Sequence, residues 1–90
     1  MPDHDPRLLI LAPEDNVCVA CATLPEGEAV VIDGVALALP ETVRIAYKVA
    51  RRDIARGETV LKYGAPIGSA TAKIPAGRVV HTHNMKSDYL

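Results

Sequence analysis

A unit of seven residues occurs three times in the chain and limits the folds that it can adopt. In each copy an aliphatic residue is followed after two positions by glycine, and after two more by valine; the copies are residues 24–30, 54–60 and 74–80. Glycine adopts positive φ at little cost, which suits a tight turn that leads into the β-branched residues of a strand. Three such starts in 90 residues predict a small, mainly β domain.

Turn signals between these units divide the rest of the chain into short strands. Asp33-Gly34, flanked by aliphatic residues, is typical of a two-residue β-hairpin turn. Pro13, Pro40 and Pro66 interrupt other apolar runs. The strands that we expect are residues 8–11, 28–33, 35–39, 43–49, 59–63, 67–71 and 79–83.

One short helix is expected near the N-terminus. Asp15 and Asn16 are good capping residues, and the apolar residues that follow recur at helical spacing (Val17, Cys18, Ala20, Cys21 and Leu24). Pro25 and Gly27 would end this helix.

Length and composition indicate one domain over residues 1–90, with a polar lead at 1–7, loosely held at its start, and a polar tail at 85–90. Hydrophobic residues make up 49% of the chain, but Phe and Trp are absent, so the core must consist of Val, Ile, Leu and Ala. A chain of this size buries roughly 60–70% of its unfolded surface. Little interior is left for a deep catalytic cavity, and an exposed apolar face would be available to a partner chain.

The charge pattern argues against several classes of function. A net charge of -1 provides no basic surface for nucleic acid. No apolar run approaches the ~20 residues that span a membrane, and the first residues are acidic, unlike a signal peptide. We therefore expect a cytoplasmic protein whose two cysteines stay reduced.

The strongest candidate for a chemical site is the sequence His81-Thr82-His83-Asn84. On a strand both imidazoles would lie on one face, where they could bind a divalent metal or transfer a proton, or only hydrogen-bond within a polar sheet face. Cys18 and Cys21 could complete a Cys2His2 zinc site, but they lie in an apolar segment, where reduced cysteine behaves as a small hydrophobe.

Two lysines and one acidic pair are further candidates. Lys48 and Lys62 each lie beside a tyrosine and could bind a substrate carboxylate, although lysines at strand ends are commonly solvated. Asp15 and Asn16 would cap the helix first and bind a ligand only with outside support.

Four ordered blocks of sequence, at residues 15–20, 48–60, 62–70 and 77–84, resemble the N-terminal SAF domain of the altronate and galactarate dehydratase family. This family also contains the small subunit of (2R)-sulfolactate sulfo-lyase. The resemblance covers about residues 8 to 86. It implies a β-clip fold, a small barrel-like arrangement with long hairpins.

The resemblance also implies a function. The chain would be the small subunit of a lyase that eliminates water or sulfite from a 2-hydroxy acid, such as altronate, galactarate or sulfolactate, and it would be inactive until a separate large catalytic subunit completes it. A divalent metal, iron(II), would lie in a site shared by the two chains. His81 and His83 would be catalytic and metal-binding, and the substrate would contact Lys48, Lys62, Asn84, Asp15 and Asn16. A homo-oligomer is compatible with the same resemblance.

One position departs from the family pattern. The family usually has Gly-His-Lys where this chain has Ala46-Tyr47-Lys48. Tyrosine, with an ordinary pKa of ~10, cannot replace the imidazole as a metal ligand or proton carrier near neutral pH. Either that histidine is dispensable, or this chain has another substrate or no activity. The alternative function is a non-catalytic SAF-type binding or assembly module, such as those in type III antifreeze proteins and pilus assembly factors.

Overall fold

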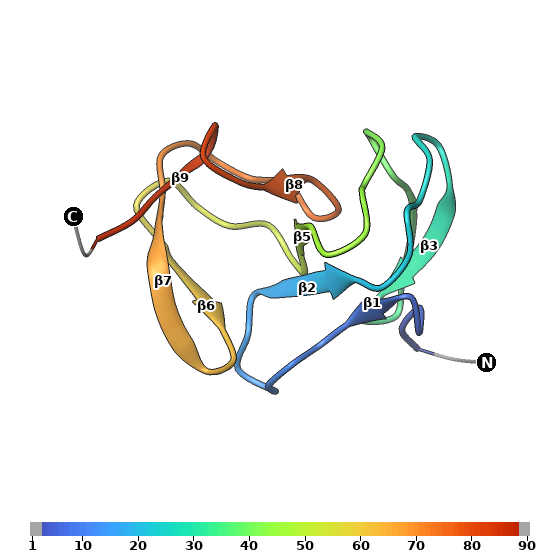
Figure 1. The fold of residues 1–90 in the computed structure, drawn as a ribbon, viewed down its shortest axis with the longest axis horizontal. Coiled ribbons are helices and arrows are strands. Elements are labelled where there is room, and N and C mark those ends of the chain that lie inside the picture. Colours follow the sequence, from blue (N-terminus) through green and yellow to red (C-terminus); the bar gives the residue numbers. More distant parts are fainter. Residues whose placement is uncertain (1–2, 89–90) are drawn as a thin grey trace.

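The computed structural model describes residues 3–88, and in that part of the chain it contains nine short strands and no helix. A four-stranded antiparallel sheet has the order β1 (Leu8–Leu9), β2 (Val17–Ala20), β5 (Lys48–Ala50) and β8 (Val79–Val80). The hairpin of β3 (Ala29–Ile32) and β4 (Val35–Ala38) lies at one end of this sheet. The hairpin of β6 (Thr59–Lys62) and β7 (Ala65–Ala70) lies at the other end, where β9 (Met85–Lys86) pairs with β7 (Figure 1). The mainly β prediction is confirmed, and the sheets do not close into a barrel.

The repeated unit is the basis of the fold, and a fourth copy lies at residues 43–49, with Ala46 in the place of glycine. Gly27, Gly57 and Gly77 have φ of 85°, 83° and 86°, and Ala46 has φ of 73°. The aliphatic residues that begin the copies pair across the chain as isolated antiparallel bridges, Leu24 with Val43 and Ile54 with Ile74. The domain therefore contains two equivalent halves, each with two copies of the unit and a hairpin between them.

The two hairpins turn in the same way. Asp33 and Gly34 both have positive φ in the first hairpin, and Tyr63 and Gly64 in the second, as a type I′ turn requires. The second hairpin contains one residue more, Ile67, which is left unpaired where the register shifts. The predicted turn at Asp33-Gly34 is confirmed.

Each half has its own apolar core. The first core cluster contains Leu8, Cys18, Ala20, Leu24, Val30, Ile32, Leu39, Val43, Val49 and Val79. The second core cluster contains Val17, Ala50, Ile54, Val60, Ala70, Ile74 and Val80. Neighbouring residues of β2 and β5 belong to different clusters, so the four-stranded sheet separates the two cores and is buried on both faces over most of its length.

The predicted helix after Asn16 is wrong, because Val17–Ala20 form strand β2 in the middle of the sheet. Val17, Cys18 and Ala20 are all buried, since one face of β2 meets each core cluster. Burial on both faces removes the alternation that distinguishes a strand from a helix in sequence. Asp15 and Asn16 do not cap a helix but bond to another part of the chain, described below.

Several predicted strand limits are also wrong. The strand expected at 8–11 ends at Leu9, and the one expected at 43–49 begins only at Lys48. Strand β7 begins at Ala65, and β8 ends at Val80. The expected polar tail contains β9, which hydrogen-bonds along β7.

The polar lead is also held more firmly than expected. Within it, Asp5 is buried and donates its backbone N–H to the carbonyl of Val31 at 2.7 Å. Residues 3–88 include no helix long and apolar enough to cross a membrane.

Candidate functional site

Lys48 and Lys62 lie near enough for the charge of Lys62 to act on Lys48. Lys48 is on β5, where it pairs with Val19 and Val80, and Lys62 ends β6 next to the buried Val60. Both side chains are half-buried. Burial lowers the pKa of Lys48 below its ordinary value of 10.5, and the neighbouring charge of Lys62 lowers this pKa further.

The internal duplication shows that these lysines occupy core positions. Ile32 precedes the turn of the first hairpin as Lys62 precedes that of the second, and Ile32 is fully buried. Ala20 and Ala50 are equivalent, because their carbonyls accept the N–H groups of Ala46 and Gly77. Two residues before them lie Cys18, which is fully buried, and Lys48. The second half therefore has a pair of ammonium groups where the first half has apolar side chains.

No carboxylate neutralises this pair within residues 3–88. The six ion pairs in that range involve Arg7 twice, Arg51, Arg52, Lys73 and Arg78. Two unpaired, half-buried cations that repel each other are unfavourable unless an anion neutralises them. The geometry is therefore suited to binding a carboxylate.

Asp15 and Asn16 are almost completely buried, with 3% and 2% of their surface exposed, and both hold the second hairpin in place. The Asp15 carboxylate accepts the backbone N–H groups of Tyr63 at 2.9 Å and Gly64 at 2.8 Å. The Asn16 amide donates to the carbonyl of Thr59 and accepts the N–H of Leu61, both at 2.8 Å. The sequence interpretation expected Asp15 and Asn16 to contact the substrate. In this structure their side chains bond to the second hairpin, and their contact with substrate stays a prediction.

The His81-Thr82-His83-Asn84 segment is a turn, and the prediction that both imidazoles share one face of a strand is wrong. Asn84 closes the turn: its side-chain Oδ1 accepts the N–H of His81 at 2.9 Å and its Nδ2 donates to the carbonyl of Val79 at 2.8 Å. The strand cannot continue, because the backbone N–H of Met85 folds back to the carbonyl of His81.

The two histidines have different surroundings. The ring of His81 stacks on that of Tyr47, with centroids 5.6 Å apart and planes inclined by 21°. His83 lines a polar hollow of about 390 Å³ together with Glu41, Lys73, Arg78 and Asn84. Both histidines are exposed, and their assignment as catalytic groups stays a prediction.

These residues do not fit a metal bound by this chain alone. Residues 3–88 contain no group of three or more His, Cys, Asp or Glu side chains placed to hold a metal ion. Cys18 is buried and Cys21 exposed, and neither forms a disulfide. A metal near the histidine turn would need ligands from outside the described residues.

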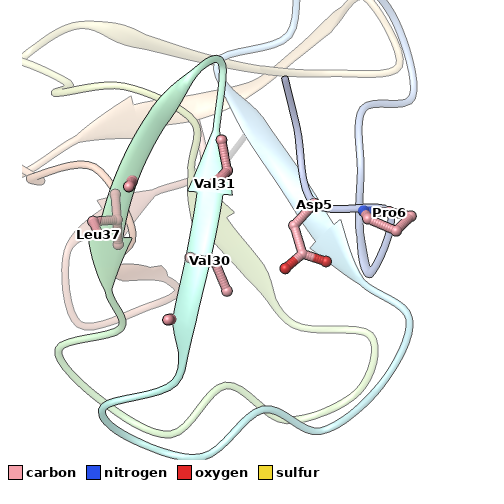
Figure 2. Close-up of a pocket in the computed structure, with 7 residues that line it drawn as sticks. Asp5, Pro6, Val30, Val31 and Leu37 are labelled. Carbon is pink, nitrogen blue, oxygen red and sulfur yellow. The ribbon is translucent and has the colours of Figure 1, made fainter. Parts of the chain in front are cut away.

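A second hollow, of about 410 Å³, lies away from these residues and is lined mainly by apolar groups. Figure 2 shows Asp5 and Pro6 facing Val30 and Val31 of β3, with Leu37 on β4. The groove offers one carboxylate, on Asp5, which bonds to Arg7. It is therefore less suited than the lysine pair to an anionic substrate.

The sequence interpretation named Lys48 and Lys62 separately but missed that the charge of one acts on the other. Their separation along the chain gives no sign of this interaction. The duplication would have indicated this: a shift of 30 residues places Lys48 on Cys18 and Lys62 on Ile32, both of which are buried. Alanine in the place of the diagnostic glycine concealed the fourth copy of the unit, at residues 43–49, and with it the duplication.

Comparison with known proteins agrees with the resemblance. The model of the altronate/galactarate dehydratase SAF domain matches residues 6–88. Altronate dehydratase of Escherichia coli (strain K12) is 47% identical over 74 residues, which are 82% of this chain and 15% of that protein. Altronate dehydratase of Bacillus subtilis (strain 168) is 32% identical over 75 residues, 83% of this chain and 15% of that protein.

A shorter relative matches part of the chain. Subunit alpha of (2R)-sulfolactate sulfo-lyase from Chromohalobacter salexigens is 43% identical over 47 residues, which are 52% of this chain and 50% of that subunit. The matched segments thus span about a seventh of the altronate dehydratases and half of the sulfo-lyase subunit.

Proposed function

Because this chain belongs to the SAF-domain family of altronate and galactarate dehydratases, we propose that it is the small subunit of a cytoplasmic lyase acting on 2-hydroxy acids. The relatives include a named subunit alpha, which supports a separate partner chain. The substrate would be a sugar acid or a sulfonated hydroxy acid, and the partner would be a larger catalytic chain of the same family.

The observation that carries the proposal is the pair Lys48 and Lys62. Two cations without a carboxylate partner among residues 3–88, set at positions that are apolar core in the other half, form a binding site for an anion. A 2-hydroxy acid has a carboxylate at every pH near neutrality. Ion pairing with the half-buried lysines would fix the carboxylate and leave the adjacent carbon facing the partner chain.

The reaction is a β-elimination. A base removes the proton from the carbon that bears the hydroxyl group and the carboxylate. The electron pair of that C–H bond forms a C=C bond while the bond to the group on the next carbon breaks: a hydroxyl group takes a proton from an acid and leaves as water, and a sulfonate group leaves as sulfite. The resulting enol takes up a proton on carbon and loses the proton of its hydroxyl group, which gives a 2-keto acid. The positive charge of Lys48 and Lys62 lowers the energy of the electron-rich intermediate, because it offsets negative charge on the carboxylate.

The histidine turn would lie beside the same reaction centre, because His81 stacks on Tyr47, the residue that precedes Lys48. His81 and His83 are proposed to transfer protons or to join a shared divalent metal, iron(II), with Asn84 holding the turn. The ligand count described above means that most of the metal's ligands would come from the larger chain. Such an ion would supply Lewis-acid assistance when bound.

Binding by this chain alone can be tested without its partner. The chain is titrated with D-glycerate, a small 2-hydroxy acid, and lysine side-chain signals are followed by NMR. We expect the Lys48 and Lys62 signals to shift together, and Lys48→Gln or Lys62→Gln to weaken binding. Lys73→Gln is the matched control, because Lys73 is 71% exposed. Equal effects of all three substitutions would show only nonspecific ion pairing and would contradict the proposed site.

Activity requires the larger chain. We expect co-purification of this chain with a large dehydratase-like chain from the same genome to give metal-dependent 2-keto acid formation. His83→Ala would abolish turnover but leave the complex intact, whereas Thr82→Ala would change neither. A stable complex that consumes neither 2,3-dihydroxy acids nor sulfolactate would support the non-catalytic assembly module instead.

A further inference from the structure

We propose that Asp15 and Asn16 are positioning residues: they set the spacing of Lys48 and Lys62 by clamping the second hairpin onto the start of β2. This inference rests on the proposed use of the lysine pair to bind a carboxylate. It also gives the two buried side chains a role that requires no contact with substrate.

The clamp holds the backbone on both sides of Lys62. Asn16 receives the N–H of Leu61, and Asp15 receives that of Tyr63. All side-chain atoms of this clamp that are shielded from solvent have hydrogen-bond partners within residues 3–88. Because Lys62 lies between two fixed residues, its Cα cannot move without breaking buried bonds.

The backbone of Lys48 is held by β2, the strand that follows Asp15 and Asn16. Three residues after Asn16, Val19 pairs in register with Lys48 across β2 and β5. The carbonyl of Asn16 also accepts the N–H of Arg51 at 2.9 Å, which ties the end of β5 to the clamp. One segment, residues 15–19, therefore holds the backbone from which both lysine side chains extend.

The first hairpin is held differently, by backbone bonds and by the partly exposed side chains of His4 and Arg51, which bond to Asp33. There Asp5 donates its backbone N–H to Val31, and the N–H of Gly34 bonds to the carbonyl of Asp3. The turn of this first hairpin is followed by the apolar strand β4, and the first half has no lysine at the positions of Lys48 and Lys62. The half that contains the lysines is the half that is clamped by two side chains with 3% and 2% exposure.

The test measures the lysine spacing in the chain alone. The pKa of Lys48 is measured by NMR of its labelled ε-carbon in wild type, Asp15→Asn and Asn16→Leu, which keep similar volumes. We expect this pKa to rise toward 10.5 in both variants, because Lys48 gains solvent and Lys62 moves away. Loss of the Asp15 charge without movement would lower the pKa of Lys48, so the sign separates displacement from electrostatics.

The control is Asp53→Asn, which removes a carboxylate that accepts the N–H of Ala76 elsewhere in the domain, and it should leave Lys48 unchanged. An unchanged or lowered Lys48 pKa in folded Asp15→Asn and Asn16→Leu would overturn the inference. Failure of both variants to fold would overturn it too, since the clamp would then hold the whole domain. If wild type does not bind D-glycerate but the Lys48 pKa still rises in the variants, only the proposed function fails.

Discussion

Replacing Ala46 by glycine should stabilise the domain, although it removes a methyl group. Ala46 has φ of 73°, a left-handed conformation that costs an L-residue roughly 1–2 kcal/mol. Glycine avoids this cost but loses about 0.5–1 kcal/mol more conformational freedom on folding than alanine does. Ala46 is exposed, so its methyl group contributes little burial. The expected net gain is about 0.5–1 kcal/mol, or a rise in Tm of roughly 2–8 °C.

The duplication provides a matched control for this prediction. Gly57 occupies the equivalent place in another copy, with φ of 83° and no atom within 4 Å of an added Cβ. Gly57→Ala should therefore lose about what Ala46→Gly gains. Ala38→Gly, at an exposed position of β4 without positive φ, should destabilise by about 0.5–1 kcal/mol.

Urea unfolding followed by far-ultraviolet circular dichroism measures all three changes. The midpoint should rise for Ala46→Gly and fall for the other two variants, with unchanged slopes. A lower midpoint for Ala46→Gly, comparable to that of Ala38→Gly, would refute the reasoning, because position 46 would then not be strained. Unequal magnitudes for positions 46 and 57 would show that the copies are less equivalent than their backbone suggests.

Three further predictions follow from individual contacts. Lys48→Met should raise the free energy of unfolding near neutral pH, because a half-buried charge beside Lys62 is removed; since the folded chain releases this proton at a pH below 10.5, the advantage should shrink as the pH rises toward 10.5, as urea titrations across that range would show. Gly77→Ala should cost more stability than Gly57→Ala in the same assay, because its Cβ would lie 2.9 Å from Cδ1 of Leu37. Cys21 should react with a thiol reagent at pH 8 in the folded protein, whereas Cys18, whose burial raises its pKa to about 12, should react only in denaturant; rapid reaction of two thiols would contradict its burial.

The parts of the fold that could be predicted are those set by local backbone geometry. Gly27, Gly57 and Gly77 stand where φ is positive, and Asp33-Gly34 forms the expected hairpin turn. Each of these signals depends on a residue whose conformational freedom is unusual, so the sequence alone reveals it. The family resemblance, carried by four blocks of residues, was confirmed over residues 6–88.

The errors arise where distant parts of the chain determine the conformation. Asp15 and Asn16 satisfy the local rule for a helix cap, but they bond to residues of β6 and its turn, which are remote in sequence. Val80 is followed by a turn in which the side chain of Asn84 bonds back to His81, three residues earlier, while its carbonyl accepts the N–H of Thr71, beyond the end of β7. The strand prediction at this point overlooked a local side-chain bond that competes with the strand, as well as the remote bond to Thr71.

The duplication explains why the second half needs contacts that the first half lacks. Lys48 and Lys62 occupy two positions that are apolar core in the first half. At a third pair of equivalent positions, the first half has the larger Leu39 and the second half has Ala70. The lost burial has to be offset, since core aliphatic groups supply most of the folding free energy. Strand β9, bonded along β7, and the clamp of Asp15 and Asn16 are found on this half, whereas the equivalent edge of β4 has no strand beside it among residues 3–88. We infer that hydrogen bonds replaced apolar packing in the half that carries the proposed binding site, and that removing β9, whose Met85 packs against the second core cluster, would destabilise the second core before the first.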